Sequence, residues 1–478
     1  MRITAMHESE IAFLSIEEAG RLLRSRKISP VDLVDAALGR IERLNPRLNA
    51  FLTVTADSAR RAARRAEKEL QKGRDRGPLH GIPISLKDNI CTRGIRTTAG
   101  SKILADFIPE ADATVARRLS RAGAILIGKT ILHEFAYGIT SENPHYGAVH
   151  NPWALERTTG GSSGGSAAAL ASGIGFSSVG TDTGGSIRIP AALCGIVGLK
   201  PTFGRVSCHG VVPLARSFDH VGPLARTVAD AAIVLRAIAG RDALDPASIA
   251  CAVPDYPRKL KTRLGKVRLG WPREYFFDRV DVEVQQAVES AARKLKRMGA
   301  TLEEISLPNI SASVEPSTQI ALVESNRYHE ACGYYPARAA DYGEDVRKRL
   351  ELGEAVRAVD YLAALETRKI VMGDFDAAFK RVDAILAPSV PVPAPRIGQP
   401  RVKIGEEEES VRSALIRTNR PGNFTGLPAI SVPCGFTRSG LPIGLQLIGR
   451  AWEEVRLLQI AYAYERATEW HKRHPRLD

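Results

Sequence analysis

After Gly81, short apolar runs bounded by glycine alternate with stretches of helical periodicity, and this alternation constrains the fold more than any other feature. The runs "IPISL", "AILIG" and "GIVGL" have the length and composition of buried strands, and residues 112–123 have the spacing of a helix. Strands that alternate with helices indicate an α/β fold, with a mixed, largely parallel β-sheet core flanked by helices. Later runs add strands to this sheet: "VRLGW", "AILAP", "AISVPCG" and "IGLQLIG".

The first quarter of the chain carries the start signals of helices. Ser15 with Glu18 three residues later matches a capping box. Ser29 followed by Pro30 matches an N-cap and a first helical residue. No charge block, proline-rich linker or internal repeat divides the 478 residues, so we expect a single domain over residues 1–478.

The net charge of +14 and the pI near 9.6 raise the question of a nucleic-acid partner. Much of the positive excess lies in residues 58–73, where alanines recur at helical spacing and arginines fill the other faces. We interpret this segment as a helix that docks through a narrow alanine stripe and exposes a solvated basic face. No aromatic or base-reading motif accompanies the charge, so we expect no specific nucleic-acid partner.

The sequence predicts a cytoplasmic protein that does not enter membranes. Residues 1–15 lack the apolar segment and cleavage site of a signal peptide, and no apolar run reaches the ~18 residues of a membrane span. The cysteines lack the paired spacing of zinc ligands, and a chain of this length has little need of a disulfide framework. They are Cys91, Cys194, Cys208, Cys251, Cys332 and Cys434.

Three motifs match reactive sites only in part. Residues 123–130, "GAILIGKT", have phosphate-loop spacing, but the apolar residues between the glycines favour a buried strand. The pattern around Ser162 fits the nucleophile elbow of serine hydrolases, but the preceding "HNPWALERTT" is turn-like, so no strand is expected to enter. His133 lacks the second histidine of a zinc-protease motif. Nucleotide binding and a histidine base stay as the weaker alternatives.

Three polar segments remain, each beside glycines or a strand end. "GIPISLKDNI" places Lys87 at the end of an apolar strand, and "TTGGSSGGS" offers Ser162 and Ser163. "GTDTGGSIRIP" places Ser186 after two glycines. With these blocks and their spacing the chain resembles the amidase signature family, over nearly its whole length. The resemblance divides the single domain into an N-terminal helical segment (1–76), a signature core (79–230) and the remainder (231–478).

The resemblance implies that Ser186 is a nucleophile, Ser162 a bridging serine in a cis peptide, and Lys87 the base. A serine hydroxyl becomes reactive when a base takes its proton, and lysine is a base only when neutral. Burial behind an apolar strand lowers the pKa of an ammonium group, as this role requires. Ser162 can accept one hydrogen bond and donate another, so it can relay a proton.

The glycines before Ser186 allow neighbouring backbone N–H groups to converge on one point, where an oxyanion would be stabilised. The predicted donors of this oxyanion hole are Thr183, Gly184, Gly185 and Ser186. We expect Asp182 and Arg188 to pair and brace the same loop. Ser163 is expected to have a supporting role, hydrogen-bonded near the lysine and not reacting itself.

Two branches of the family compete. One is a free-standing amidase, which hydrolyses a small amide, ester or carbamate. The other is the glutaminase component (the A protein) of the glutamine-dependent tRNA amidotransferase, which the chain resembles in "GGSSGGSAAA" and "GLKPTFGRVS". That component carries an aspartate five residues before the proline matching Pro421, where this chain has Ile416, and a glutamine where this chain has Ile189. A buried, unpaired ammonium is costly, so isoleucine cannot hold the glutamine α-amino group.

We therefore predict a stand-alone amidase acting on a small, apolar amide, and the alternative is the amidotransferase component. Tyr137, Ile189 and Ile416 are the predicted lining of its substrate pocket, and Phe135 belongs either to that lining or to the core. No cofactor and no metal are expected, because the lysine and serines need neither. The implied partner is a small-molecule amide substrate, and a homodimer is left open.

Overall fold

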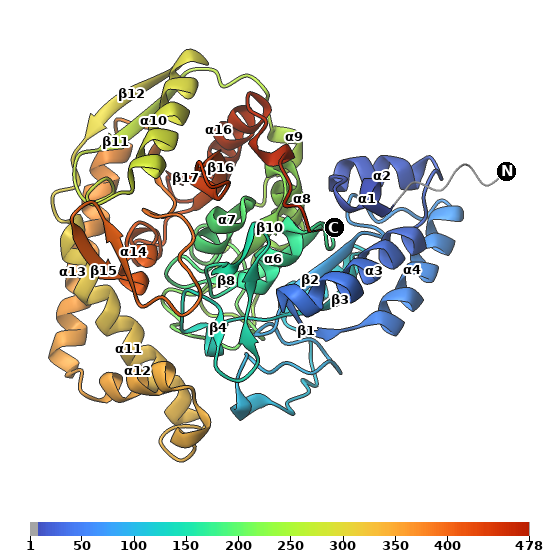
Figure 1. The fold of residues 1–478 in the computed structure, drawn as a ribbon, viewed down its shortest axis with the longest axis horizontal. Coiled ribbons are helices and arrows are strands. Elements are labelled where there is room, and N and C mark those ends of the chain that lie inside the picture. The colour runs from blue at the N-terminus through green and yellow to red at the C-terminus, as the bar shows by residue number, and fades with distance from the viewer. Residues whose placement is uncertain (1–7, 478) are drawn as a thin grey trace.

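The chain is built around one central mixed β-sheet (Figure 1). The structure is a computed structural model that describes residues 8–477, so residues 1–7, where the predicted N-terminal segment begins, lie outside the described residues. The sheet has the strand order β1 (Phe51–Val54), β3 (Ile125–Thr130), β2 (Pro83–Lys87), β8 (Ser177–Asp182), β10 (His220–Ala225), β9 (Val197–Lys200), β16 (Ala429–Phe436), β17 (Pro442–Gly449), β13 (Ala384–Pro388), β11 (Val267–Pro272) and β12 (Ala300–Ile305).

Strand direction varies across the sheet. β3, β2 and β8 run parallel, as do β13, β11 and β12, whereas the strands between these groups pair antiparallel and β1 is antiparallel to β3. Parallel pairs need a crossover, and α5 (Thr114–Arg121) and α10 (Val282–Arg297) supply it. A short turn joins β16 to β17, which forces an antiparallel pair. The predicted α/β fold with a mixed sheet flanked by helices is confirmed, and its parallel pairs lie in the two outer groups.

Helices pack on the sheet and cover its β1 end, whereas β12 lies at the outer edge of the other end (Figure 1). At the β1 edge lie α1 (Glu8–Ala12), α2 (Ile16–Arg24), α3 (Pro30–Leu48) and α4 (Ala56–Gln71). Against the sheet lie α6 (Gly164–Ala171), α7 (Arg188–Cys194), α8 (Val228–Ile238), α10 and α16 (Glu454–Arg466), and α9 (Tyr256–Lys259) packs on α8 and α16. Further helices are α11 (Val314–Ala331), α12 (Glu344–Glu354), α13 (Ala358–Phe379), α14 (Val411–Arg417) and α15 (Arg420–Phe424).

Shorter elements connect these layers. The single-turn 3₁₀ helices are η1 (Lys102–Leu104), η2 (Glu134–Ala136), η3 (Ile310–Ser313), η4 (Ala339–Asp341) and η5 (Trp470–Lys472). Two-stranded ribbons pair β4 (Glu142–Asn143) with β5 (Gly147–Ala148), β6 (His150–Asn151) with β7 (Ala154–Thr158), and β14 (Arg401–Ile404) with β15 (Glu407–Ser410).

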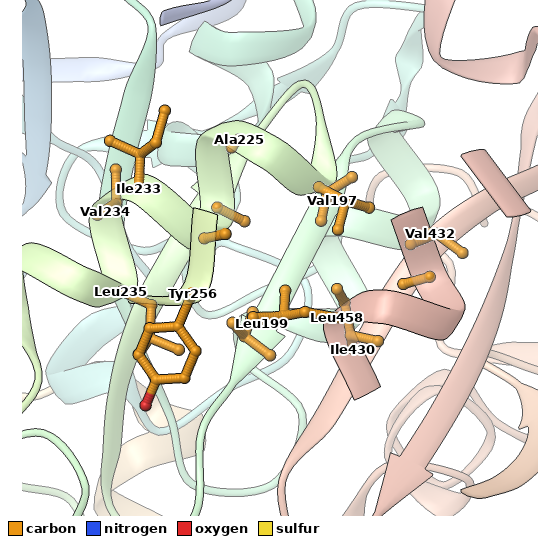
Figure 2. Close-up of a cluster of buried hydrophobic side chains, with 14 of the residues drawn as sticks. Val197, Leu199, Ala225, Ile233, Val234, Leu235, Tyr256, Ile430, Val432 and Leu458 are labelled. Carbon is orange, nitrogen blue, oxygen red and sulfur yellow. The ribbon is translucent and has the colours of Figure 1, made fainter. Parts of the chain in front are cut away.

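The alternation of side chains along β9 shows why the sheet is buried on both faces. Val197 and Leu199 join a large apolar cluster with residues of α8, α16 and β16 (Figure 2). Gly198, between them, points to the other face, where a Cβ would lie 2.6 Å from the Cβ of Ala191 in α7. Each fully buried leucine or valine side chain contributes about 1.5–3 kcal/mol to stability, so this two-sided packing fixes the strand.

The helix starts expected from the sequence are present. The Ser15 side chain accepts from the N–H of Glu18, whose carboxylate accepts from the N–H of Ser15 in return. Pro30 begins α3 after the N-cap Ser29. In α4, the arginines face outward, and three alanines of the predicted stripe are buried: Ala59, Ala63 and Ala66.

Of the predictions made for the phosphate-loop-like segment and for the segment before Ser162, one is confirmed and one is wrong. Residues 125–130 form β3 inside the central sheet, so the strand predicted in place of a phosphate loop is confirmed. The prediction that no strand precedes Ser162 is wrong, because β7 ends at Thr158. β7 pairs with β6 in a small ribbon and keeps most of its residues partly exposed, so it lacks the apolar run by which buried strands are recognised.

Within residues 8–477, every helix is too short or too polar to cross a lipid bilayer. The described residues form one α/β domain, whereas the subdivision at residues 76–79 and 230–231 stays a prediction.

Candidate active site

Three segments that are far apart in the sequence meet at the ends of β2 and β8. Lys87 is the last residue of β2, Ser162 lies in the loop before α6, and Ser186 lies between β8 and α7. Lys87 Nζ donates 2.7 Å hydrogen bonds to Ser162 Oγ and to Thr181 Oγ1. The N–H of Ser163 donates to the carbonyl oxygen of Ser186 over 3.2 Å, which ties the two serine loops together. The peptide bond before Ser162 is cis.

The amino group of Lys87 lies in an unusual environment for a lysine. Lys87 has 0% exposure, and among the described residues its nearby carboxylates, Asp182 and Asp219, act on it without forming an ion pair. Burial lowers the pKa of Lys87 to about 7, against the weaker opposite effect of the Asp182 and Asp219 carboxylates. A large fraction of Lys87 is therefore neutral near pH 7 and able to accept a proton.

Asp182 and Arg188 form the predicted pair, and it is buried. Arg188 Nη2 and Nε donate to the Asp182 carboxylate over 3.0 and 3.1 Å, and Asn423 Nδ2 donates to it over 2.8 Å. Burial alone would raise the pKa of Asp182, but the charge and hydrogen bonds of Arg188 outweigh it and hold the pKa below its usual value. The loop that carries Ser186 is thus braced at its base.

The backbone amides before Ser186 divide into two groups. Gly185, predicted as an oxyanion donor, instead donates its N–H to Asp182 Oδ1 over 2.8 Å. Its φ of +123° turns this N–H towards the buried Asp182–Arg188 pair. The N–H groups of Thr183, Gly184 and Ser186 have no acceptor among the described residues. These three residues line a cavity, so three of the four predicted donors are free to hold an oxyanion.

The glycines around Ser162 are required by close packing. A Cβ at Gly165 would lie 2.5 Å from the carbonyl oxygen of Ala50 and 2.6 Å from that of Ile131. α6 can therefore approach the strand ends closely only with glycine in its first turn. This packing holds the serine loop against β1 and β3.

A model of the family described as Amidase matches residues 32–458. The chain belongs to the amidase signature family. It is 42% identical to the A component of the glutamyl-tRNA(Gln) amidotransferase from Moorella thermoacetica, over 98% of this chain and 99% of that protein. Among solved structures it is similar to an amidase (37% identity, TM-score 0.85, covering 95% and 99% of the two chains). It is also similar to a chain of a vestigial complex linked to the origins of an s-triazine catabolic enzyme (34%, TM-score 0.90, covering 95% and 98%).

In this amidase-family chain, a small cavity opens onto Ser186. Tyr137 and Ile416, two of the residues expected in the substrate pocket, are among its lining residues. Ile189 does not line it; its side chain packs behind the Ser186 loop, where Cβ atoms at Gly160 or Gly185 would collide with it. Phe135 is a core residue, in edge contact with the ring of His329 at 4.4 Å between centroids.

Sequence reasoning missed two arginines of this cavity, Arg412 and Arg420. They stand four residues before and after Ile416, a spacing that is visible in the sequence and typical of one helical face. Thr181, the second acceptor of the lysine, was also missed, because a threonine within a buried strand gives no distinguishing signal.

No three His, Cys, Asp or Glu side chains come together as metal ligands within residues 8–477. The expectation that the amidase works without metal or cofactor stays a prediction.

Proposed function

We propose that this chain hydrolyses an amide through an acyl-enzyme on Ser186. The observation that carries the proposal is the buried 2.7 Å contact of Lys87 Nζ with Ser162 Oγ, in a loop bonded to that of Ser186. A pKa of Lys87 near 7 and free amides beside Ser186 support it, since a base and an oxyanion site are what acyl transfer requires. Membership of the amidase family supports it independently.

In the first step, Ser186 Oγ attacks the amide carbonyl carbon. Its proton passes to Ser162 Oγ as the Ser162 proton passes to Lys87 Nζ, which becomes an ammonium. The carbonyl oxygen becomes an oxyanion held by the N–H groups of Thr183, Gly184 and Ser186. When the intermediate collapses, the carbon–nitrogen bond breaks, and the leaving nitrogen takes a proton back through Ser162.

In the second step, water attacks the ester on Ser186 and gives up a proton along the same relay. Collapse of the second intermediate breaks the bond to Ser186 Oγ, which recovers its proton. The products are a carboxylic acid and ammonia or an amine, and the enzyme returns to its starting state.

The two branches of the family receive support from different observations. The 42–43% identity to the A components of tRNA amidotransferases, over 97–99% of the chain, favours the amidotransferase branch over a hydrolase of apolar amides. Against glutamine as substrate stands the cavity, which presents Ile416 and no Asp or Glu among its described lining residues. The amidotransferase component is therefore our second candidate, in which the ammonia would pass to a partner.

The experiment that tests the proposal is a hydrolysis screen with the purified chain and its Ser186→Ala variant. Primary amides, anilides, esters, carbamates and glutamine are offered, and acid, amine or ammonia is measured. The wild type should hydrolyse at least one amide. The variant should hydrolyse the same amide ~10⁴-fold or more slowly, because no other group can form the acyl-enzyme. Equal rates for the two proteins would refute the role of Ser186.

A further inference from the structure

Arg412 is an unpaired cation in the substrate cavity. Among the described residues it makes no hydrogen bond and no ion pair, and its guanidinium carbon lies 6.0 Å from the centre of the Tyr137 ring, a cation–π approach. Burial and the positive charges of Arg349 and Arg420 lower the pKa of Arg412 to about 9, against the weaker opposite effect of Tyr137 and the Asp345 carboxylate, so it remains charged at neutral pH. Arg420, in the same cavity, donates to the Thr318 hydroxyl over 2.6 Å and to the Val314 carbonyl over 3.4 Å, and to no carboxylate of residues 8–477.

Three buried arginines elsewhere in the fold each pair with a carboxylate, whereas Arg412 and Arg420, which are partly buried, pair with none among the described residues. Arg188 pairs with Asp182, Arg205 with Glu454 and Arg417 with Glu409. Arg226 donates to two backbone carbonyls. Arg349, next to the cavity, is neutralised by Asp345 at 3.0 Å. Partial burial of a guanidinium without a carboxylate partner has a desolvation cost, so two such groups in one cavity indicate an anion that belongs there.

The other residues that line the cavity indicate which groups the anionic ligand can carry besides its negative charge. No Asp or Glu lies among the described residues that line the cavity, so an ammonium group has no partner there. Phe218, Phe424 and Ile416 supply an apolar wall. Ile416 lies beside the Ser186 loop, since a Cβ at Gly184 would lie 3.0 Å from its Cδ1. Along α14 and α15, the arginines therefore flank the residue that contacts the oxyanion loop.

We infer that the substrate is an amide that carries a carboxylate, held by Arg412 and Arg420, and no free ammonium group. The inference rests on the amide hydrolysis proposed above and replaces the apolar substrate expected from Ile416 alone. Guanidinium groups bind carboxylates through two parallel charge-assisted hydrogen bonds, which fixes the orientation of the ligand as well as its affinity. A carboxylate at the arginines then leaves the amide at the Ser186 end of the cavity.

Half-amides of dicarboxylic acids provide matched probes. Malonamate, succinamate and glutaramate are compared with propanamide, butanamide and pentanamide of equal chain length, and glutaramate with glutamine, which adds only the α-ammonium. We expect at least one half-amide to have a kcat/KM on the order of 10–100-fold above its uncharged partner, the contribution of charged hydrogen bonds. Glutamine should be a poorer substrate than glutaramate, because its ammonium lacks a partner.

Arg412→Gln and Arg412→Lys test the residue directly. Arg412→Gln should reduce the ratio between half-amide and uncharged amide by ~10-fold or more, and Arg412→Lys should restore part of it. Arg438→Gln, at a side chain with 97% exposure, is the matched control and should leave the ratio unchanged. Thermal stability gives a readout that does not depend on turnover. Glutarate should stabilise the Ser186→Ala protein against heat, and it should not stabilise the protein that carries both Ser186→Ala and Arg412→Gln.

The failure of this inference is distinguishable from failure of the proposed function. Uncharged amides could be hydrolysed in a reaction that depends on Ser186, with no preference for a half-amide and no binding of glutarate. In that case the inference of an anionic substrate is wrong, and the proposal of an amide hydrolase stands. If a serine-directed phosphonate fails to label Ser186, the hydrolase itself is wrong. A preference for glutamine over glutaramate would overturn the exclusion of an ammonium group.

Discussion

Lys87 is the residue whose protonation state controls the proposed chemistry. Burial lowers its pKa to about 7, and only the neutral form accepts the proton that Ser162 relays. The kcat/KM for an uncharged amide should therefore rise with pH, about tenfold per unit well below pH 7, and level off above it. A pH–rate profile between pH 5 and 9 measures this.

A matched histidine variant separates lysine from histidine as the group that titrates. His209→Gln should leave the profile in place, because His209 does not line the cavity. Lys87→Ala should lower kcat/KM by about 10²–10⁴-fold, the usual contribution of a general base. A profile that is flat from pH 5 to 9, or one that disappears in His209→Gln, contradicts the assignment.

At the scale of elements, the loop between β8 and α7 depends on the buried Asp182–Arg188 pair. Asp182→Asn removes the charge that Arg188 needs and weakens the bond that holds the Gly185 amide. Breaking a buried pair from one side costs about 3–5 kcal/mol, so the free energy of unfolding should fall by that amount. Urea unfolding monitored by fluorescence measures the loss.

An exposed ion pair serves as the comparison for this prediction. Lys348 pairs with Glu344 one turn away on α12, with both side chains more than half exposed. Lys348→Gln should cost less than about 1 kcal/mol, since solvent already screens the pair. Similar losses in the free energy of unfolding for Asp182→Asn and Lys348→Gln would show that the Asp182–Arg188 pair does not stabilise the loop.

The elements differ in how much of them the sequence could predict. Capping residues and apolar runs act over a few positions, so the starts of α2 and α3 and strand β3 followed directly. The polar ribbon strand β7 lacked such a signal. Which face a residue presents depends on the packed fold, so Ile189 was expected in the pocket and lies behind it. The turn of Gly185 towards Asp182 likewise depends on a contact that forms only in the loop.

At the scale of the whole molecule, the similarity to the A components of tRNA amidotransferases runs nearly end to end, while no Asp or Glu for the glutamine ammonium lies among the described residues of the cavity lining. We expect the purified chain to hydrolyse its amide without ATP, tRNA or a companion protein. Ammonia release with and without each addition measures this. A chain that is inert alone, and that releases ammonia from glutamine once amidotransferase companions are added, would place it in the other branch.

The central claim is that Ser186 forms a covalent bond to the acyl group, with Ser162 and Lys87 as its proton relay. The most direct measurement is the mass spectrum of the chain after a serine-directed phosphonate, followed by mapping of the modified peptide. The account predicts one label per chain, on Ser186, lost in Ser186→Ala and slowed in Lys87→Ala. A label on Ser162 or Ser163, or an unlabelled chain under conditions where it hydrolyses amides, would contradict it.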